Sequence, residues 1–318
     1  MRRGSRKLSS DLSWLGTEQI NRTSSDLDQK SALQIARIIN SEDAKVAPAV
    51  RRALPQIARA IDLIAGSLQR GGRLIYVGTG TSGRIAALDA AECPPTFGTD
   101  SHTVQFVIAG GNKALSAPVE ASEDSRLLGR REIAKRRPAK NDVVVGIAAS
   151  GRTPFTIAAV QYARQRGAKT IAVTCNRNSA LEKASHLAIV TEVGPEVISG
   201  SSRMKAGTAQ KMVLNMLSTG AMARLGYVYG NLMVNVDLKN IKLSQRGIRI
   251  LQRTTRLKAR DALRSLEAAD ERIPLAVVMQ QAGVSRRQAE EALKSAKGHV
   301  RRAIEKAKQG RQLLAPGS

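Results

Sequence analysis

Aromatic side chains and cysteines are scarce in this chain, and each scarcity excludes a class of protein. Only 3% of the 318 residues are Phe, Tyr or Trp, whereas 42% are hydrophobic, so aliphatic side chains must fill the core. The two cysteines, Cys93 and Cys175, are too few for a disulfide framework, and no Cys or His spacing indicates a zinc site. We therefore expect reduced thiols with a packing role and no metal.

The sequence also lacks a hydrophobic run long enough to span a bilayer. Its basic N-terminus has no apolar stretch of the kind found in secretory signals, so we predict a cytoplasmic protein with no membrane partner. Acidic residues are in deficit, with 26 Asp and Glu against 51 Lys and Arg, and the formal net charge is +25. Such a charge is typical of nucleic-acid-binding proteins.

The basic residues are spread along the chain rather than gathered in a recognition motif. Residues 129–140 form the densest run, and no helix-turn-helix, zinc finger or aromatic RNA-binding signature accompanies it. We interpret the excess as a solvated basic surface that also attracts an anionic substrate. A nucleic-acid-binding factor that uses the basic tail stays as an alternative, and salt-sensitive binding to arbitrary DNA is its test.

Short apolar runs rich in Val and Ile alternate with helical stretches in the middle of the chain. The runs cover residues 73–77, 104–109, 142–148, 169–174 and 187–191. Helices are expected over residues 83–91, 114–136, 154–166, 179–184 and within 200–226. This alternation predicts the α/β class, with a doubly wound parallel five-stranded sheet covered by helices on both faces.

Helical patterns without strands flank this central part. Three-to-four spacing of apolar residues predicts helices in residues 31–72, and three short helices are expected in residues 276–307, with Ser285 capping the middle one. We therefore predict an N-terminal helical segment over 1–70, an α/β ligand-binding domain over 71–240 and a basic helical subdomain over 241–318.

A turn rich in glycine and hydroxyl groups, GTGTSG, follows the first strand. Gly80 lets the backbone approach a ligand, the amides at the next helix start attract an anion, and Thr81 and Ser82 add hydroxyl donors. The G-x-G-x-x-G spacing is also that of dinucleotide-binding proteins. However, the second strand ends in IAGGNK, without the acid that would hold the ribose, and this departure argues against a nicotinamide cofactor.

Two further turns have a similar composition. The turn after the third strand offers hydroxyls, amides and one guanidinium from Ser150, Gly151, Arg152 and Thr153. In residues 199–207, Ser201 and Ser202 are candidate substrate ligands, and Lys205 is a candidate partner of phosphate. Ser and Thr also cap helices whatever the function, and for the last turn the two interpretations have equal weight. Turns that converge on one sheet edge suit a single phosphomonoester.

Carboxylates near these turns are candidate acid–base groups. Glu92 precedes a Cys-Pro-Pro run, and we expect the prolines to end the helix there and to fix the carboxylate at the mouth of the cleft. Downstream of the second strand, residue chemistry alone does not rank Glu120, Glu123 and Asp124, which also suit a helix start. Two carboxyl groups that flank a sugar can act as acid and base if burial raises the pKa of one.

Together these motifs resemble the N-acetylmuramic acid 6-phosphate etherases. The resemblance is carried by IYVGTGTSGRIAALDAAECPPTFG, EASEDS, VVVGIAASGRTPF and GSSRMKAGTAQKMVLNMLSTG. It extends from about residue 17 to residue 243, and more loosely into the helical tail. Motifs of this length are far more specific than the glycine spacing alone.

The resemblance implies a sugar-isomerase-type domain that binds phosphate with its strand-end loops and works as a homodimer without metal or redox cofactor. It implies cleavage of the ether between D-lactate and carbon 3 of N-acetylmuramic acid 6-phosphate, by elimination of lactate and addition of water. Two glutamates carry this chemistry in the family, and they match Glu92 and Glu123. We assign Glu92 to protonation of the lactate oxygen and Glu123 to the proton on carbon 2.

The main alternative is a regulatory protein that senses sugar phosphates without catalysis. The glucokinase-regulating relatives share these loops but are much longer, with two such sheet domains. This chain has one such domain and keeps the Glu-Cys-Pro-Pro run, so the etherase hypothesis is favoured.

Overall fold

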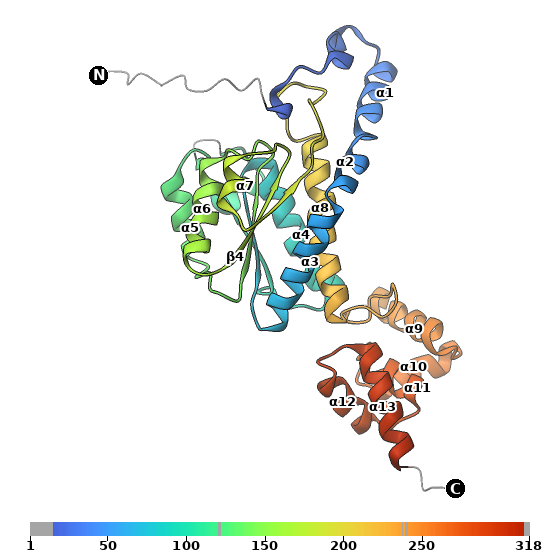
Figure 1. Ribbon diagram of the computed structural model, residues 1–318. Coiled ribbons are helices and arrows are strands. Elements are labelled where there is room, and N and C mark those ends of the chain that lie inside the picture. Colours follow the sequence, from blue (N-terminus) through green and yellow to red (C-terminus); the bar gives the residue numbers. More distant parts are fainter. Residues whose placement is uncertain (1–14, 120–121, 237, 239–240, 315–318) are drawn as a thin grey trace.

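A five-stranded sheet lies at the centre of the computed structural model, which describes residues 15–119, 122–236, 238 and 241–314 (Figure 1). Its strands are β1 (Leu74–Gly78), β2 (Val104–Ile108), β3 (Val143–Ile147), β4 (Lys169–Thr174) and β5 (Leu187–Val190). The strand order is β2-β1-β3-β4-β5, and every pairing is parallel. The predicted sheet is therefore confirmed, with each strand on its expected apolar run.

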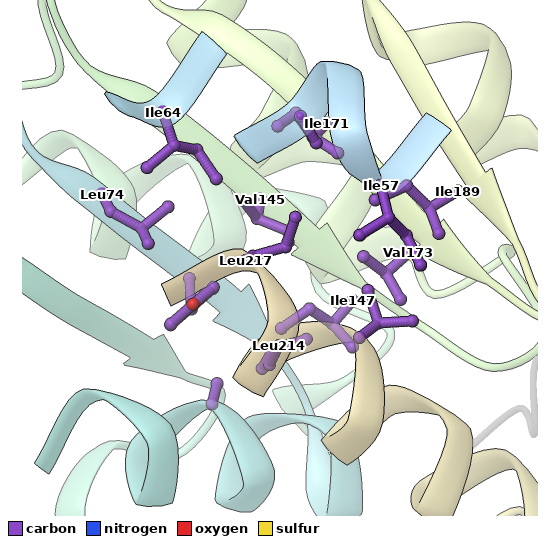
Figure 2. Close-up of a cluster of buried hydrophobic side chains, with 14 of the residues drawn as sticks. Ile57, Ile64, Leu74, Val145, Ile147, Ile171, Val173, Ile189, Leu214 and Leu217 are labelled. Atoms are coloured by element: carbon purple, nitrogen blue, oxygen red, sulfur yellow. The ribbon is translucent and has the colours of Figure 1, made fainter. Parts of the chain in front are cut away.

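One face of the sheet packs against three long helices, α3 (Leu54–Gln69), α4 (Gly80–Phe97) and α8 (Lys205–Leu225). Figure 2 shows this core, in which Leu74, Val145 and Ile171 of the strands lie with Ile64 of α3 and Leu217 of α8. All five are fully buried, and burial of one such side chain contributes about 1.5–3 kcal/mol. Branched aliphatic side chains thus make up for the scarcity of aromatic ones.

The opposite face is covered by α5 (Arg126–Ala134), α6 (Pro154–Gln165) and α7 (Ala180–Ala184). Successive residues of a strand point to opposite faces, so Ile75 and Val77 of β1 belong to this second core while their neighbours belong to the first. Helices therefore cover both faces, as a doubly wound fold requires (Figure 1).

The N-terminal segment contains η1 (Gly16–Glu18), η2 (Arg22–Ser24), η3 (Leu27–Gln29), α1 (Ala32–Asp43) and α2 (Val46–Arg52). A buried ion pair ties it to the sheet domain, because Lys205 Nζ at the start of α8 donates to Glu42 Oε2 of α1 at 2.5 Å. Burial opposes the charge of Glu42, but hydrogen bonds from Lys205 and Lys45 outweigh it and lower the pKa of Glu42 to about 2.

A second hydrophobic core organises the C-terminal helices α9 (Ile241–Thr255), α10 (Ala259–Ala268), α11 (Ile273–Ala282), α12 (Arg286–Ser295) and α13 (Val300–Leu314). The three short helices expected in residues 276–307 correspond to α11, α12 and α13. Ser285 caps α12 in a reciprocal capping box with Gln288, as predicted. Across the described residues, no helix is both long and apolar enough to cross a membrane.

The predicted end of the helix after β1 was wrong. We expected the prolines to end it, but α4 continues through Pro94 and Pro95 to Phe97. Cys93 and Phe97 are buried in the core and hold the last turn in place although the prolines lack amide donors. Gly98, at φ +64°, ends the helix and donates its amide to the Pro94 carbonyl at 2.8 Å.

The helix expected over residues 114–136 is divided in the structure. The chain forms the 3-10 helix η4 (Gly111–Leu115) and then α5, which begins only at Arg126. Ser125 caps α5 by accepting the Leu128 amide at 3.2 Å, and this cap fixes the later start.

Candidate active site

The carboxyl ends of β1 and β3 lie side by side at the point where the strand order reverses. Ligands of open α/β sheets bind at such a point, and a cleft of about 360 Å³ opens here, large enough for a small ligand. The cleft is lined by seven of the residues predicted from the sequence: Gly80, Thr81, Ser82, Glu123, Ser150, Thr153 and Ser202.

The first turn presents backbone amides and hydroxyl groups to the cleft. Thr79 is extended, and α4 begins at Gly80, so the first amides of the helix have no acceptor within it and favour an anion. Gly80 has a φ of +50°, and a Cβ atom there would lie 3.2 Å from Oε1 of Glu123. A glycine at this position lets the Glu123 carboxylate lie against the turn.

The second turn is shaped by Gly151, whose φ is +68°. A Cβ atom at this position would lie 2.4 Å from the Cβ of Ser179, so a larger residue does not fit. Ser150 and Thr153 line the cleft on either side of this bend, whereas Gly151 and the half-buried Arg152 do not. Ser150 Oγ accepts the Arg152 amide at 3.2 Å, which holds the turn closed.

The structure distinguishes the carboxylates that follow β2. Glu123 lines the cleft, Asp124 does not, and Glu120 lies outside the described residues. The Glu123 carbonyl accepts the Phe155 amide at 3.0 Å, so the backbone that carries this carboxylate is fixed to the start of α6.

The third turn contributes one of its two predicted serines. Ser202 lines the cleft, whereas Ser201 does not. Lys205 is 1% exposed, pairs with Glu42 and does not line the cleft. The start of α8 is capped by Glu196, which accepts the amides of Lys205 and Ala206 at 3.0 and 2.9 Å.

Glu92 is the predicted catalytic residue that lies far from the cleft. It is exposed on α4 and does not line the cleft. It follows Gly80 by twelve residues of continuous helix, which places it about 18 Å along the helix axis at a rise of about 1.5 Å per residue. The carboxylate of Glu92 therefore does not reach the cleft of its own chain.

The structure also adds residues that the sequence patterns did not reveal. Thr17 and Glu18 of η1 line the cleft because the N-terminal segment passes over it, and no local spacing indicates this path. Arg84 lines the wall one helical turn after Gly80. It donates Nε to the Ala114 carbonyl at 2.9 Å and Nη2 to the Ala117 carbonyl at 3.1 Å, so it fixes the segment after β2.

Neither of the two thiols lines the cleft. Burial raises the pKa of both Cys93 and Cys175 to about 12, consistent with a packing role. Within the ranges that the structure describes, no three His, Cys, Asp or Glu side chains come together as a metal site.

Comparison with known proteins assigns the chain to a family. The Glucokinase regulatory protein N-terminal SIS domain family matches residues 56–164, and the SIS domain family matches residues 136–220. The N-acetylmuramic acid 6-phosphate etherase of Symbiobacterium thermophilum is 55% identical over 86% of this chain and 91% of its own length. That of Aeromonas hydrophila is 48% identical over 91% of this chain and 97% of its own length.

The chain belongs to the N-acetylmuramic acid 6-phosphate etherase family. The etherase 1 of Bacillus licheniformis is a further relative, 46% identical over 93% of this chain and 97% of its own length. The resemblance that the sequence motifs indicated is thus confirmed. Among solved structures, a phosphoheptose isomerase from Francisella tularensis is 18% identical, with a TM-score of 0.48, and the match covers 61% of this chain and 100% of that one.

Proposed function

We propose that this chain cleaves the D-lactyl ether of N-acetylmuramic acid 6-phosphate, which makes it a carbon–oxygen lyase. The observation that carries the proposal is a cleft in which a carboxylate, Glu123, lies against a glycine turn at the start of α4, where the first amides have no acceptor within the helix. The membership in the etherase family supports the choice of substrate.

In this proposal the phosphate of the substrate binds between the first two turns. The amides at the start of α4 and the hydroxyls of Thr81, Ser82, Ser150 and Thr153 donate to its oxygens. The sugar then extends along the cleft toward Glu123 and Ser202. Arg84 adds positive charge to the same wall, which suits a substrate that carries both a phosphate and a lactyl carboxylate.

The reaction uses the open-chain form of the sugar, whose carbonyl at carbon 1 acidifies the proton on carbon 2. Glu123 removes that proton, and Glu92 in its acid form protonates the ether oxygen as the bond to carbon 3 breaks. D-lactate leaves, and a double bond forms between carbons 2 and 3. Water then adds at carbon 3 with the two roles reversed, and N-acetylglucosamine 6-phosphate is formed without metal or redox cofactor.

Because Glu92 lies far from Glu123 within one chain, we propose that the catalytic pair is completed in a homodimer. Leu88, one helical turn before Glu92 on the same face of α4, is 54% exposed. An apolar groove between α3 and α8, lined by Leu54, Ile61 and Met216 among others, supplies further surface for a second copy. Glu92 of each protomer then serves the cleft of its partner.

Mixing two inactive variants tests this arrangement. E92Q and E123Q each lose turnover by about 10²–10⁴-fold, since each removes one acid–base group. When they are unfolded together and refolded, half of the dimers contain one intact pair, so about a quarter of wild-type activity returns. If the mixtures stay inactive although dimers have formed, Glu92 does not act in the cleft of the partner, and the shared arrangement is wrong. An active E92Q with an inactive E18Q would instead assign the acid role to Glu18 within the cleft.

Release of D-lactate from N-acetylmuramic acid 6-phosphate is the direct test of the reaction. The match of residues 56–164 to a regulatory-protein domain supports the alternative of a phosphosugar sensor. A sensor binds phosphosugars but releases no lactate, and an isomerase consumes glucosamine 6-phosphate in the parallel assay.

Three expectations from the sequence stay predictions. They are the division of the chain into domains at about residues 70 and 240, the cytoplasmic location and the lack of nucleic-acid binding.

A further inference from the structure

Ser82 of the cleft is hydrogen-bonded from behind by a buried glutamine. Its hydroxyl lies 2.9 Å from Oε1 of Gln210, a residue of α8 that is 1% exposed. In this arrangement the single hydroxyl hydrogen of Ser82 is given to Gln210. The Nε2 group of Gln210 is buried and has no hydrogen-bond partner within the described residues.

Binding of a phosphate requires the opposite polarity at Ser82. A serine hydroxyl has one hydrogen and two lone pairs, and the oxygens of a phosphate dianion only accept. Ser82 can therefore bind the phosphate only by turning its hydrogen into the cleft. Its oxygen must then accept a hydrogen bond from behind, and a carboxamide can supply one because its nitrogen end has the same shape as its oxygen end.

We infer that Gln210 is a positioning residue that directs the hydroxyl hydrogen of Ser82 into the cleft, an inference that rests on the proposed phosphosugar site. In the structure, Oε1 of Gln210 accepts from Ser82. When a phosphate binds, the amide is turned by 180°, Nε2 donates to Ser82 Oγ, and Ser82 donates to the phosphate. The turn gives the buried Nε2 a partner, and hydrogen bonds in such a chain strengthen one another.

The substitutions Q210E and Q210M separate this role from packing. A glutamate has nearly the same shape but only accepts when ionised, so it keeps the Ser82 hydrogen turned away from the cleft. A methionine makes no such bond and leaves the Ser82 hydroxyl free to rotate. We expect the Kd for N-acetylglucosamine 6-phosphate, measured by calorimetry, to rise by about 10- to 100-fold in Q210E and by less in Q210M.

The S82A background is the deciding control. If Gln210 acts through Ser82, Q210E weakens phosphosugar binding far less in S82A than in the wild type. Equal weakening in both backgrounds, or no weakening in either, overturns the inference. The folding of each variant is checked by its melting temperature. If Q210E does not fold, the effect of Q210M on the Kd is compared between the wild-type and S82A backgrounds instead. A wild-type protein that binds the phosphosugar but releases no lactate would remove the proposed reaction and leave this role of Gln210 intact.

Discussion

The buried ion pair between Glu42 and Lys205 makes a quantitative prediction for stability. Both side chains are almost fully buried, and they join α1 to the start of α8 just after Ser202 of the cleft. The substitution E42Q preserves the size of the side chain but leaves the ammonium group of Lys205 buried without its partner. Removal of one member of a buried pair typically costs about 3–5 kcal/mol.

The pKa of Glu42 gives a second route to the same magnitude. It is lowered from its ordinary value of 4.5 to about 2. Since a pKa shift of one unit corresponds to about 1.4 kcal/mol, the charged form of Glu42 stabilises the fold by about 3 kcal/mol at neutral pH. A lowered carboxyl pKa stabilises above the unfolded value, so this contribution is present above about pH 4.5 and is lost as the pH falls toward 2.

Urea unfolding of the wild type and E42Q at pH 7 measures this contribution, with E132Q as the control. Glu132 pairs with Lys135 on the exposed side of α5, and its removal should cost less than about 1 kcal/mol. We expect E42Q to cost about 3 kcal/mol at pH 7 and the difference from the wild type to shrink between pH 4.5 and pH 2. A loss no larger than that of E132Q would refute the reasoning.

Three further predictions concern the cleft, the thiols and the proposed dimer surface. G80A should lower kcat/KM for lactate release, because its Cβ meets the Glu123 carboxylate at a φ of +50°. The control G310A should not, because an added Cβ at the half-buried Gly310 of α13 meets open space. With thiol pKa values near 12, Cys93 and Cys175 should react with a disulfide reagent at pH 8 about a thousandfold more slowly than a free thiol, and unfolding should abolish the difference. L88D should weaken the proposed homodimer, measured by analytical ultracentrifugation, and reduce activity in proportion to the loss of dimer.

The sheet and its ligand-binding edge were predictable because their signals are local. Runs such as residues 143–147 consist of Val and Ile apart from Gly146, as strands buried on both faces require. Glycine and hydroxyl residues mark the turns after β1 and β3, and parallel strands bring their carboxyl ends to one edge. The predicted convergence of Thr81, Ser82, Ser150 and Thr153 followed from this topology and is found in the cleft.

The remaining features depend on contacts between distant parts of the chain. Lys205 was a candidate for phosphate, but its partner is Glu42, 163 residues earlier, and no local pattern pairs them. The end of α4 was misplaced because burial of Phe97 outweighs the loss of amide donors at the two prolines. Motif spacing likewise does not show that Glu92 and Glu123 lie apart within one chain. Their separation becomes visible only when α4 is seen to carry Glu92 away from the cleft.

The most direct measurement of the central claim is the isotope content of the products when N-acetylmuramic acid 6-phosphate is cleaved in D₂O containing H₂¹⁸O. Elimination followed by hydration predicts deuterium at carbon 2 of N-acetylglucosamine 6-phosphate and ¹⁸O at its carbon 3, with no ¹⁸O in the lactate hydroxyl. Lactate that carries the ¹⁸O, sugar without deuterium at carbon 2, or no lactate at all would contradict the account.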